Sequence, residues 1–355
     1  MKTAVLLLTA ALVFLFAPLV RAQSPALPTI ARWPGDRKAA IALTFDDAIA
    51  SDLDHAAPIL EKHGIHGTFF VTTGNPVWRN RAAEWRRLAE EGNEIGGHTV
   101  SHPCLQQRIQ EHSQDFSAPM MEAEIANSAQ AILNLAGTRR GLTFAYPCGN
   151  IGFGPPADQA RNVARYMDYV AQHFFAARIY GTIGVVYSDA LNVLNVEDLG
   201  PTEGRDYVAL LDMMQPALRE GQAGVFTFHG VGGDYLKVSA EALDELAAYL
   251  ERHSEIWTTT FGDLVRYIQE SQALAIKPSA SSDGAAQFLL SWPMDPVIFD
   301  LPLTAQWKLP AGWTSLRAEA DDRQLLVRIV NGPQGPLALV DVPARSQKLR
   351  LLKGQ

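Results

Sequence analysis

The feature that most constrains the fold is an alternation of short apolar runs with longer amphipathic segments between Ala39 and about Glu270. Residues 39–45 and 68–71 read as buried strands, and 81–91 and 120–136 have the periodicity of helices. Strands that alternate with helices of about 10–15 residues predict crossover connections and a parallel sheet. About six or more such units favour a closed barrel, but spacing alone leaves a doubly wound sheet open.

The pattern changes after about residue 275. Before it, 207–219 reads as a helix, 224–228 as a strand and 240–253 as a helix. Residues 277–285 are small and polar, as in a linker, and short alternating runs follow at 287–292, 303–309 and 324–330. The sequence therefore predicts an α/β domain over 23–274 and a small β-sandwich over 275–355.

The first 22 residues have the pattern of a secretory signal peptide. Lys2 precedes an apolar run over 4–20, and Val20-Arg21-Ala22 predicts cleavage after Ala22. The run is about long enough to serve as a membrane anchor instead, but Pro18 and the Val-Arg-Ala end favour cleavage. We expect an exported protein, periplasmic or secreted, with no stable membrane insertion after cleavage.

The formal net charge of −8 argues against nucleic acid or an anionic membrane surface as a partner. The chain has two cysteines, Cys104 and Cys148, too few for a disulfide framework. Nothing in the sequence indicates the oligomeric state.

Polar residues gather where the predicted strands end, which is the edge where active sites of parallel β/α folds lie. Thr44-Phe45-Asp46-Asp47 places two carboxylates directly after an apolar strand. One can bind a cation while the other faces a substrate, although acidic pairs at strand ends are more often structural.

Two histidines lie at the end of a further predicted strand, residues 94–99, in His98-Thr99-Val100-Ser101-His102. Histidines four apart on a helical turn point to one side and can bind one metal. With Asp47 they would complete a site of three protein ligands that leaves a position for water.

Two weaker signals follow. Tyr146-Pro147-Cys148-Gly149 is a turn that can aim a backbone N–H into a cleft, as an oxyanion requires. His229 ends the apolar run Phe226-Thr227-Phe228, and a lone histidine there is more often a core residue than a catalytic one.

In this order, these four motifs resemble those of the polysaccharide deacetylases of carbohydrate esterase family 4. The resemblance covers roughly 36–270. It implies a distorted (β/α) barrel over 23–274 and a divalent metal, usually Zn²⁺, with Co²⁺ or Ni²⁺ also accepted. It also implies a hydrolase that removes acetyl groups from an N- or O-acetylated polysaccharide or oligosaccharide.

The resemblance also implies residue roles. Asp47, His98 and His102 would hold the metal. Asp46 would be the base that takes a proton from the attacking water, and His229 the acid that protonates the leaving group. The backbone N–H of Cys148 would be the oxyanion donor. Three further residues are expected to contact the substrate: Tyr146, Pro147 and Thr227.

The chain departs from the family pattern in several places. Ala145 stands where many members have an Arg that orients the base, so another group must do so or Asp46 is less well tuned. Cys148 stands where many have a Tyr, and Thr227 where a Leu usually lines the acetyl pocket. The fourth motif has no clear match, and Asp189 and Asp198 are candidates only by position.

Because Cys104 follows the second motif and Cys148 belongs to the third, we expect a disulfide that ties two active-site loops together, with two buried free thiols as the alternative. Two rival functions remain. One is a catalytically weak or inactive glycan-binding protein on the same fold. The other is a hydrolase of a non-sugar amide.

Overall fold

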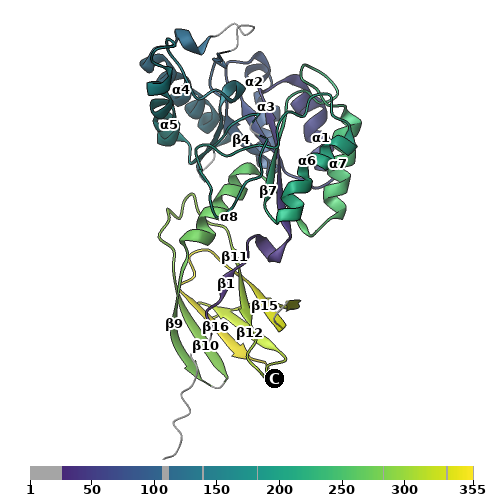
Figure 1. The fold of residues 1–355 in the computed structure, drawn as a ribbon, viewed down its shortest axis with the longest axis vertical. Coiled ribbons are helices and arrows are strands. Elements are labelled where there is room, and N and C mark those ends of the chain that lie inside the picture. Colours follow the sequence, from purple (N-terminus) through teal and green to yellow (C-terminus); the bar gives the residue numbers. More distant parts are fainter. Residues whose placement is uncertain are drawn as a thin grey trace, which may run out of the picture.

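A computed structural model describes residues 26–105, 112–137, 140–181, 183–282, 284–332 and 335–354. The predicted signal peptide therefore lies outside the described residues. An α/β unit stands above a smaller β unit, with α8 between them (Figure 1). The helical segments are η1 (Pro34–Asp36), η2 (Asp52–Ala56), α1 (Ala57–Lys62), α2 (Pro76–Asn80), α3 (Ala82–Glu90), η3 (Ser113–Asp115), α4 (Ala118–Ala136), η4 (Pro147–Gly149), α5 (Gln159–His173), α6 (Tyr207–Glu220), α7 (Ala240–Arg252) and α8 (Phe261–Ala273).

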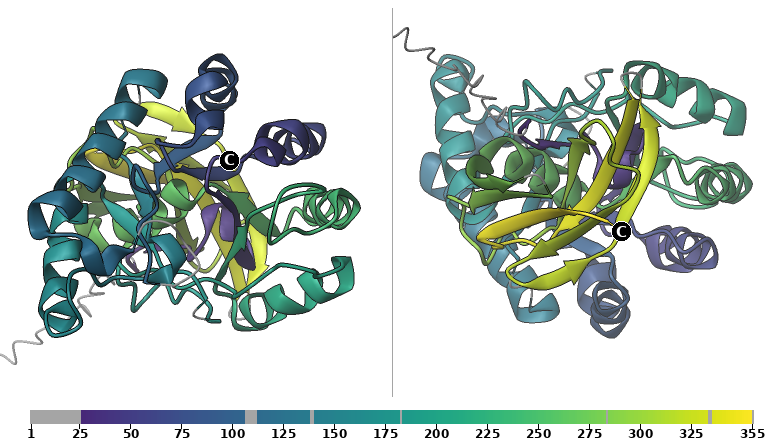
Figure 2. Two further views of the ribbon diagram at one scale, coloured as in Figure 1. Left: turned by 90° about the horizontal axis from the view of Figure 1, so that it is seen from above. Right: turned by 90° about the horizontal axis from the view of Figure 1, so that it is seen from below.

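The upper unit is built on a parallel sheet of seven strands in the order β6-β5-β4-β3-β2-β7, with β8 paired to the first half of β2. Its strands are β2 (Ala39–Asp46), β3 (Thr68–Val71), β4 (Glu94–Gly97), β5 (Thr143–Ala145), β6 (Ala176–Arg178), β7 (Ala223–Phe228) and β8 (Ile256–Thr259). Seen from above, the helices lie around the outside of this sheet (Figure 2, left). Every residue of β2 is buried, which explains why its sequence is a continuous apolar run rather than an alternation.

The gap between the outer strands β6 and β7 is bridged by an irregular segment. The N–H of Ile179 donates to the carbonyl of Val196, and the N–H of Leu199 donates to that of Val225. An isolated bridge then pairs Pro201 with Thr227. The result is the distorted barrel that the family resemblance implies.

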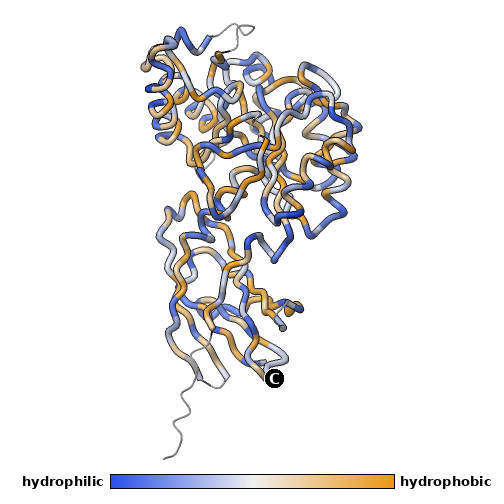
Figure 3. The backbone as a smooth tube through the Cα atoms, viewed as in Figure 1, coloured by the Kyte–Doolittle hydropathy of each residue, from blue (hydrophilic) through white to orange (hydrophobic). Residues whose placement is uncertain are grey.

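Side chains of β2 alternate between two cores. Phe45 stacks between Phe69 and Phe228, at ring distances of 4.8 and 5.3 Å, in the core shared with the outer helices. Figure 3 shows hydrophobic and hydrophilic residues interleaved along those helices, as expected for helices with one buried face. Ala40 and Ala42 belong to a second core, with residues of α8. Since side chains in a strand alternate, Thr44 and Asp46 share the face of these alanines.

The β unit consists of two antiparallel sheets, β1-β11-β15-β14 and β13-β12-β16-β10-β9, as expected for a small β-sandwich. Its strands are β1 (Thr29–Ile30), β9 (Ala275–Ser282), β10 (Ala285–Ser291), β11 (Leu303–Lys308), β12 (Leu316–Ala320), β13 (Arg323–Leu325), β14 (Val327–Gly332), β15 (Gly335–Val342) and β16 (Lys348–Lys353).

Two expectations about this unit need correction. The segment 277–285 is not a linker: most of it forms the edge strand β9, where one face is solvated and small polar residues are tolerated. The N-terminal strand β1 pairs with β11, so the start of the α/β segment contributes a strand to the β unit.

Candidate active site

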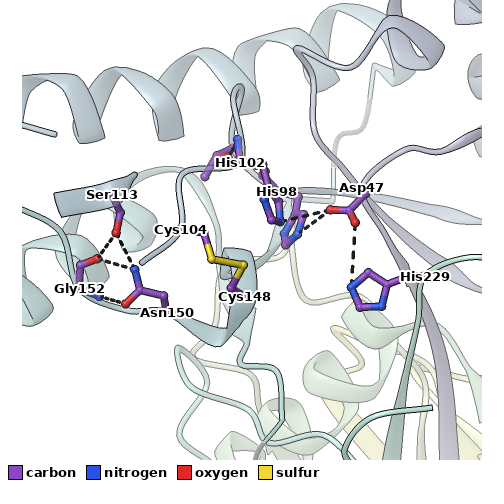
Figure 4. Close-up of a disulfide and its surroundings, with 10 residues drawn as sticks. Asp47, His98, His102, Cys104, Ser113, Cys148, Asn150, Gly152 and His229 are labelled. Carbon is purple, nitrogen blue, oxygen red and sulfur yellow. Dashed lines mark hydrogen bonds and ion pairs between the residues drawn. A yellow bond between two sulfur atoms is a disulfide. The ribbon is translucent and has the colours of Figure 1, made fainter. Parts of the chain in front are cut away.

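The polar residues singled out in the sequence follow strands that share one edge of the parallel sheet. Asp46 ends β2 and Asp47 follows it, His98 follows β4, and His229 follows β7. Because the strands are parallel, their carboxyl ends bring these side chains into one site. Figure 4 shows Asp47, His98 and His229 there.

Three side chains of the site form a cluster that fits a metal ion. Asp47 Oδ1 lies 3.3 Å from His98 Nε2 and 3.3 Å from His102 Nε2. A tetrahedral zinc with ligand bonds of about 2.0–2.1 Å separates its ligand atoms by about 3.3 Å. Asp47 Oδ1 is buried and has no hydrogen-bond donor among the described residues, which is costly unless a cation binds there. Among the described residues, these three side chains form the group of His, Cys, Asp or Glu residues that could hold a metal ion.

The charge states of Asp47 and His102 suit metal binding. Burial alone would raise the pKa of Asp47, but the nearby imidazoles of His98 and His102 hold that pKa well below its usual range. Burial lowers the pKa of His102 to about 4, so its imidazole is neutral at pH 7. His98 Nδ1 contacts the carbonyl oxygen of Ala145 at 2.8 Å, which sets the ring so that Nε2 faces Asp47.

The backbone around the cluster adopts conformations that side chains rarely favour. Asp47, Thr99, His102 and Cys148 have φ values of 85°, 64°, 58° and 55°, all in the left-handed region. Such residues persist only where neighbouring contacts over-determine them, and they gather at functional sites. Here one contact is Glu124 of α4, whose Oε2 accepts hydrogen bonds from the N–H groups of Val100 and Ser101 at 2.9 and 2.8 Å.

Asp46 is held by a residue that the sequence reading missed. Arg178, at the end of β6, is fully buried, and its guanidinium nitrogen lies 2.6 and 2.5 Å from the two oxygens of Asp46. Arg178 pairs in register with Ala145, the position where an arginine was expected. Paired residues of neighbouring strands point to the same face, so the guanidinium comes from the next strand along. The available signal was an arginine ending the apolar run 174–177.

The arginine is itself fixed by a polar network. Its second terminal nitrogen donates to Thr227 Oγ1 at 2.8 Å, and that hydroxyl contacts Asp198 at 2.8 Å. Of the two aspartates considered for the fourth motif, Asp198 is therefore beside the site, whereas Asp189 is exposed.

A cavity of about 370 Å³ opens over the cluster. His229 lies in its wall, with Nε2 4.0 Å from Asp47 Oδ2 and its ring edge-on to Tyr180. The lining residues are Asp46, Asp47, His102, Cys148, Tyr180, His229, Tyr235 and Leu236.

The three residues expected to contact substrate do not line this cavity. Tyr146 is fully buried, and its hydroxyl donates to the carbonyl of Leu194. Pro147 is buried at the start of η4, and Thr227 is bonded within the Arg178 network. Their positions suit support of the site rather than direct contact with a ligand.

Cys104 and Cys148 are joined by a disulfide beside the metal cluster, with Cα atoms 6.0 Å apart (Figure 4). The bond connects the loop that follows His102 to the turn of η4. Both loops therefore keep a fixed relation at the edge of the site.

Comparison with protein families agrees with this geometry. Residues 34–171 match the family model described as polysaccharide deacetylase. These residues belong to the polysaccharide deacetylase family. The matched segment includes Asp46, Asp47, His98 and His102, and it ends before Arg178.

Individual relatives match over different lengths. A gellan lyase from a Bacillus species is 26% identical over 316 residues, 81% of this chain and 12% of that protein. A peptidoglycan-N-acetylglucosamine deacetylase from Bacillus cereus is 42% identical over 71 residues, 19% of this chain and 24% of that protein. The chain thus spans no more than a quarter of these two relatives. The solved structure of the peptidoglycan deacetylase PdaC from Bacillus subtilis aligns with a TM-score of 0.43 at 20% identity, over 66% of this chain and 93% of that one.

Proposed function

We propose that this polysaccharide deacetylase family member is a metal-dependent hydrolase that releases acetyl groups from an N- or O-acetylated carbohydrate. The observation that carries the proposal is one cavity lined by two members of a metal-fitting cluster, a second carboxylate and a further histidine. The similarity to the peptidoglycan-N-acetylglucosamine deacetylase of Bacillus cereus favours N-acetylated sugars among the possible substrates.

Asp47, His98 and His102 would hold the cation, Zn²⁺ by the chemistry of the ligands, with Co²⁺ or Ni²⁺ also possible. A bound divalent cation supplies Lewis acidity to a carbonyl oxygen and lowers the pKa of water. The proton transfers and the binding of the oxyanion would be carried out by residues that line the cavity.

Asp46 is placed to act as the general base. Its carboxylate lines the cavity next to Asp47, and Arg178 fixes both of its oxygens. A carboxylate held in this way can accept a proton from a water molecule in the cavity.

His229 is placed to act as the general acid. It lies in the cavity wall, where a protonated imidazole can donate a proton to the leaving amine or alkoxide. Cys148 lines the same cavity, where its backbone N–H would donate to the developing oxyanion.

We further propose that the mature chain acts after export, in the periplasm or outside the cell. The N-terminal pattern of Lys2 and the apolar run supports this location. In the part of the chain that the structure describes, no helix is both long and apolar enough to span a bilayer.

The test is acetate release by purified residues 23–355, with zinc or with a chelator, on acetylated xylan, chitooligosaccharides and peptidoglycan. We expect chelator-sensitive release that falls by about 10²–10⁴-fold in Asp46→Asn, because that change removes the base. Bound metal without acetate release would favour a different acyl substrate. No metal and no release would favour the inactive glycan-binding alternative.

A further inference from the structure

The loop after His229 has a built conformation over residues 230–238. The N–H of Gly230 donates to the carbonyl of Tyr235, and an isolated bridge joins Val231 to Val238. A Cβ at Gly230 would lie 2.2 Å from the carbonyl oxygen of Gly233, so only glycine fits there. The loop therefore folds back on itself directly beside the candidate acid.

The same loop is tied to the segment that follows the two aspartates. Asp234 Oδ2 accepts a hydrogen bond of 2.8 Å from the N–H of Ser51. The hydroxyl of Ser51 in turn accepts one of 3.2 Å from the N–H of Val231. Asp234 and Leu236 have φ values of 57° and 44°, so Tyr235 is flanked on both sides by left-handed residues. Neighbouring contacts must hold such a conformation, and here it directs one side chain.

That side chain contacts the metal cluster. The hydroxyl of Tyr235 donates to Asp47 Oδ2 at 2.6 Å, although the residue as a whole is 51% exposed. His229 Nε2 also faces this oxygen but lies 4.0 Å away, beyond hydrogen-bond reach. The two oxygens of Asp47 are thus divided: Oδ1 faces His98 and His102, and Oδ2 is taken by the phenol.

We propose that Tyr235 is a positioning residue that restricts Asp47 to binding the metal through one oxygen. This inference rests on the proposed metal site. A carboxylate left free to rotate could present both oxygens to a cation and fill the position that a reacting water needs. The phenol holds the carboxylate in the one-oxygen orientation before any metal binds. No family motif found in the sequence contains Tyr235.

The test is a zinc titration of the metal-free chain against a chromophoric chelator. We expect Tyr235→Phe to weaken zinc binding by about 10- to 100-fold, as loss of a partner of a metal ligand does. Asp234→Ala should weaken it in the same direction, because it releases the loop from Ser51. With Co²⁺ in place of zinc, the visible absorption of Tyr235→Phe should be weaker than that of the wild type, since a second carboxylate oxygen raises the coordination number.

The matched control is Tyr187→Phe, which removes an equivalent phenol–carboxylate hydrogen bond, 2.8 Å to Glu220, outside the site. It should bind zinc like the wild type. Wild-type affinity and an unchanged cobalt spectrum in Tyr235→Phe would overturn the inference while leaving the metal site intact. A wild-type chain that binds no zinc would overturn the inference and the proposed function together. Thermal unfolding of each variant shows that it is folded.

Discussion

The carboxylates at the two ends of the barrel, Asp47 and Glu94, differ in their hydrogen bonding. At the carboxyl ends of the strands, Asp47 Oδ1 is buried with no hydrogen-bond donor among the described residues, and the backbone of Asp47 is left-handed. At the opposite end, Glu94 begins β4, and both of its oxygens are fully bonded. Thr143 Oγ1 donates to one oxygen at 2.6 Å, while Thr68 Oγ1 and the N–H of Gly262 donate to the other at 2.8 and 2.7 Å.

Glu94 has the contacts of a structural residue. It joins the first residues of three strands, and the N–H of Gly262 belongs to the first turn of α8, where a negative charge is favourable. Asp47 has the contacts of a metal ligand, because one of its oxygens faces two histidines and has no donor among the described residues. The comparison teaches that completeness of hydrogen bonding, rather than burial or charge, separates the two roles in this barrel.

The largest expected effect comes from Arg178. Arg178→Met leaves Asp46 without its cation, and removing one partner of a buried pair costs about 3–5 kcal/mol. Thermal unfolding should show this loss, and acetate release should fall by about 10²–10⁴-fold because the base is no longer fixed.

A relocated arginine sharpens this prediction. Because Ala145 pairs in register with Arg178, the double variant Ala145→Arg, Arg178→Ala should recover part of the lost acetate release. Wild-type activity in Arg178→Met would show that Asp46 needs no partner.

The next largest effect is expected from removing the disulfide between Cys104 and Cys148. It closes a loop with a sequence separation of 44, and removing such a bond costs about 2–4 kcal/mol. Replacing both Cys104 and Cys148 by Ser should lower the melting temperature and also reduce acetate release, since Cys148 lines the cavity. A lower melting temperature with wild-type acetate release would mean that the disulfide, like Glu94, has a structural role alone.

At the other end of the barrel, Glu94→Gln should affect stability alone. Gln keeps the shape but replaces one acceptor oxygen by a donor, so the free energy of unfolding should fall by about 2–3 kcal/mol. The rate of acetate release per folded molecule should stay at the wild-type value. A fall in that rate without a change in melting temperature would break the comparison.

Glu270 tests whether incomplete bonding alone marks a functional site. Its Oε1 accepts from the N–H of Leu301, its Oε2 has no donor among the described residues, and burial raises its pKa to about 7. Between pH 4.5 and 7 the Glu270 carboxyl is protonated in the folded state but ionised in the unfolded state. The contribution of this protonation to the free energy of unfolding is therefore full below pH 4.5 and is lost as the pH rises through 7.

Glu270→Gln should accordingly narrow the difference in melting temperature between pH 5 and pH 8 by a few degrees, without changing acetate release at either pH. An effect on acetate release would mean that this carboxyl, far from the metal cluster in sequence, takes part in function.

Much of the α/β unit could be predicted from its sequence because its signals are local. Asp46 and Asp47 follow an apolar strand directly, and the spacing of His98 and His102 suits one metal. Arg178 could not be assigned, because its partner Asp46 lies 132 positions away and the pairing depends on strand order. Tyr235 could not be found either, since loop conformation sets its direction. The strand β9 was missed because an edge strand tolerates the polar residues that usually mark linkers.

The central claim is that Asp47 binds a metal and Glu94 does not, and it can be tested most directly by zinc content. Purified wild type, Asp47→Asn and Glu94→Gln would each be loaded with zinc, freed of excess and measured for bound metal. We expect one zinc ion per chain in the wild type and in Glu94→Gln, and none in Asp47→Asn. Equal zinc content in Asp47→Asn and the wild type, or no zinc in the wild type, would contradict it.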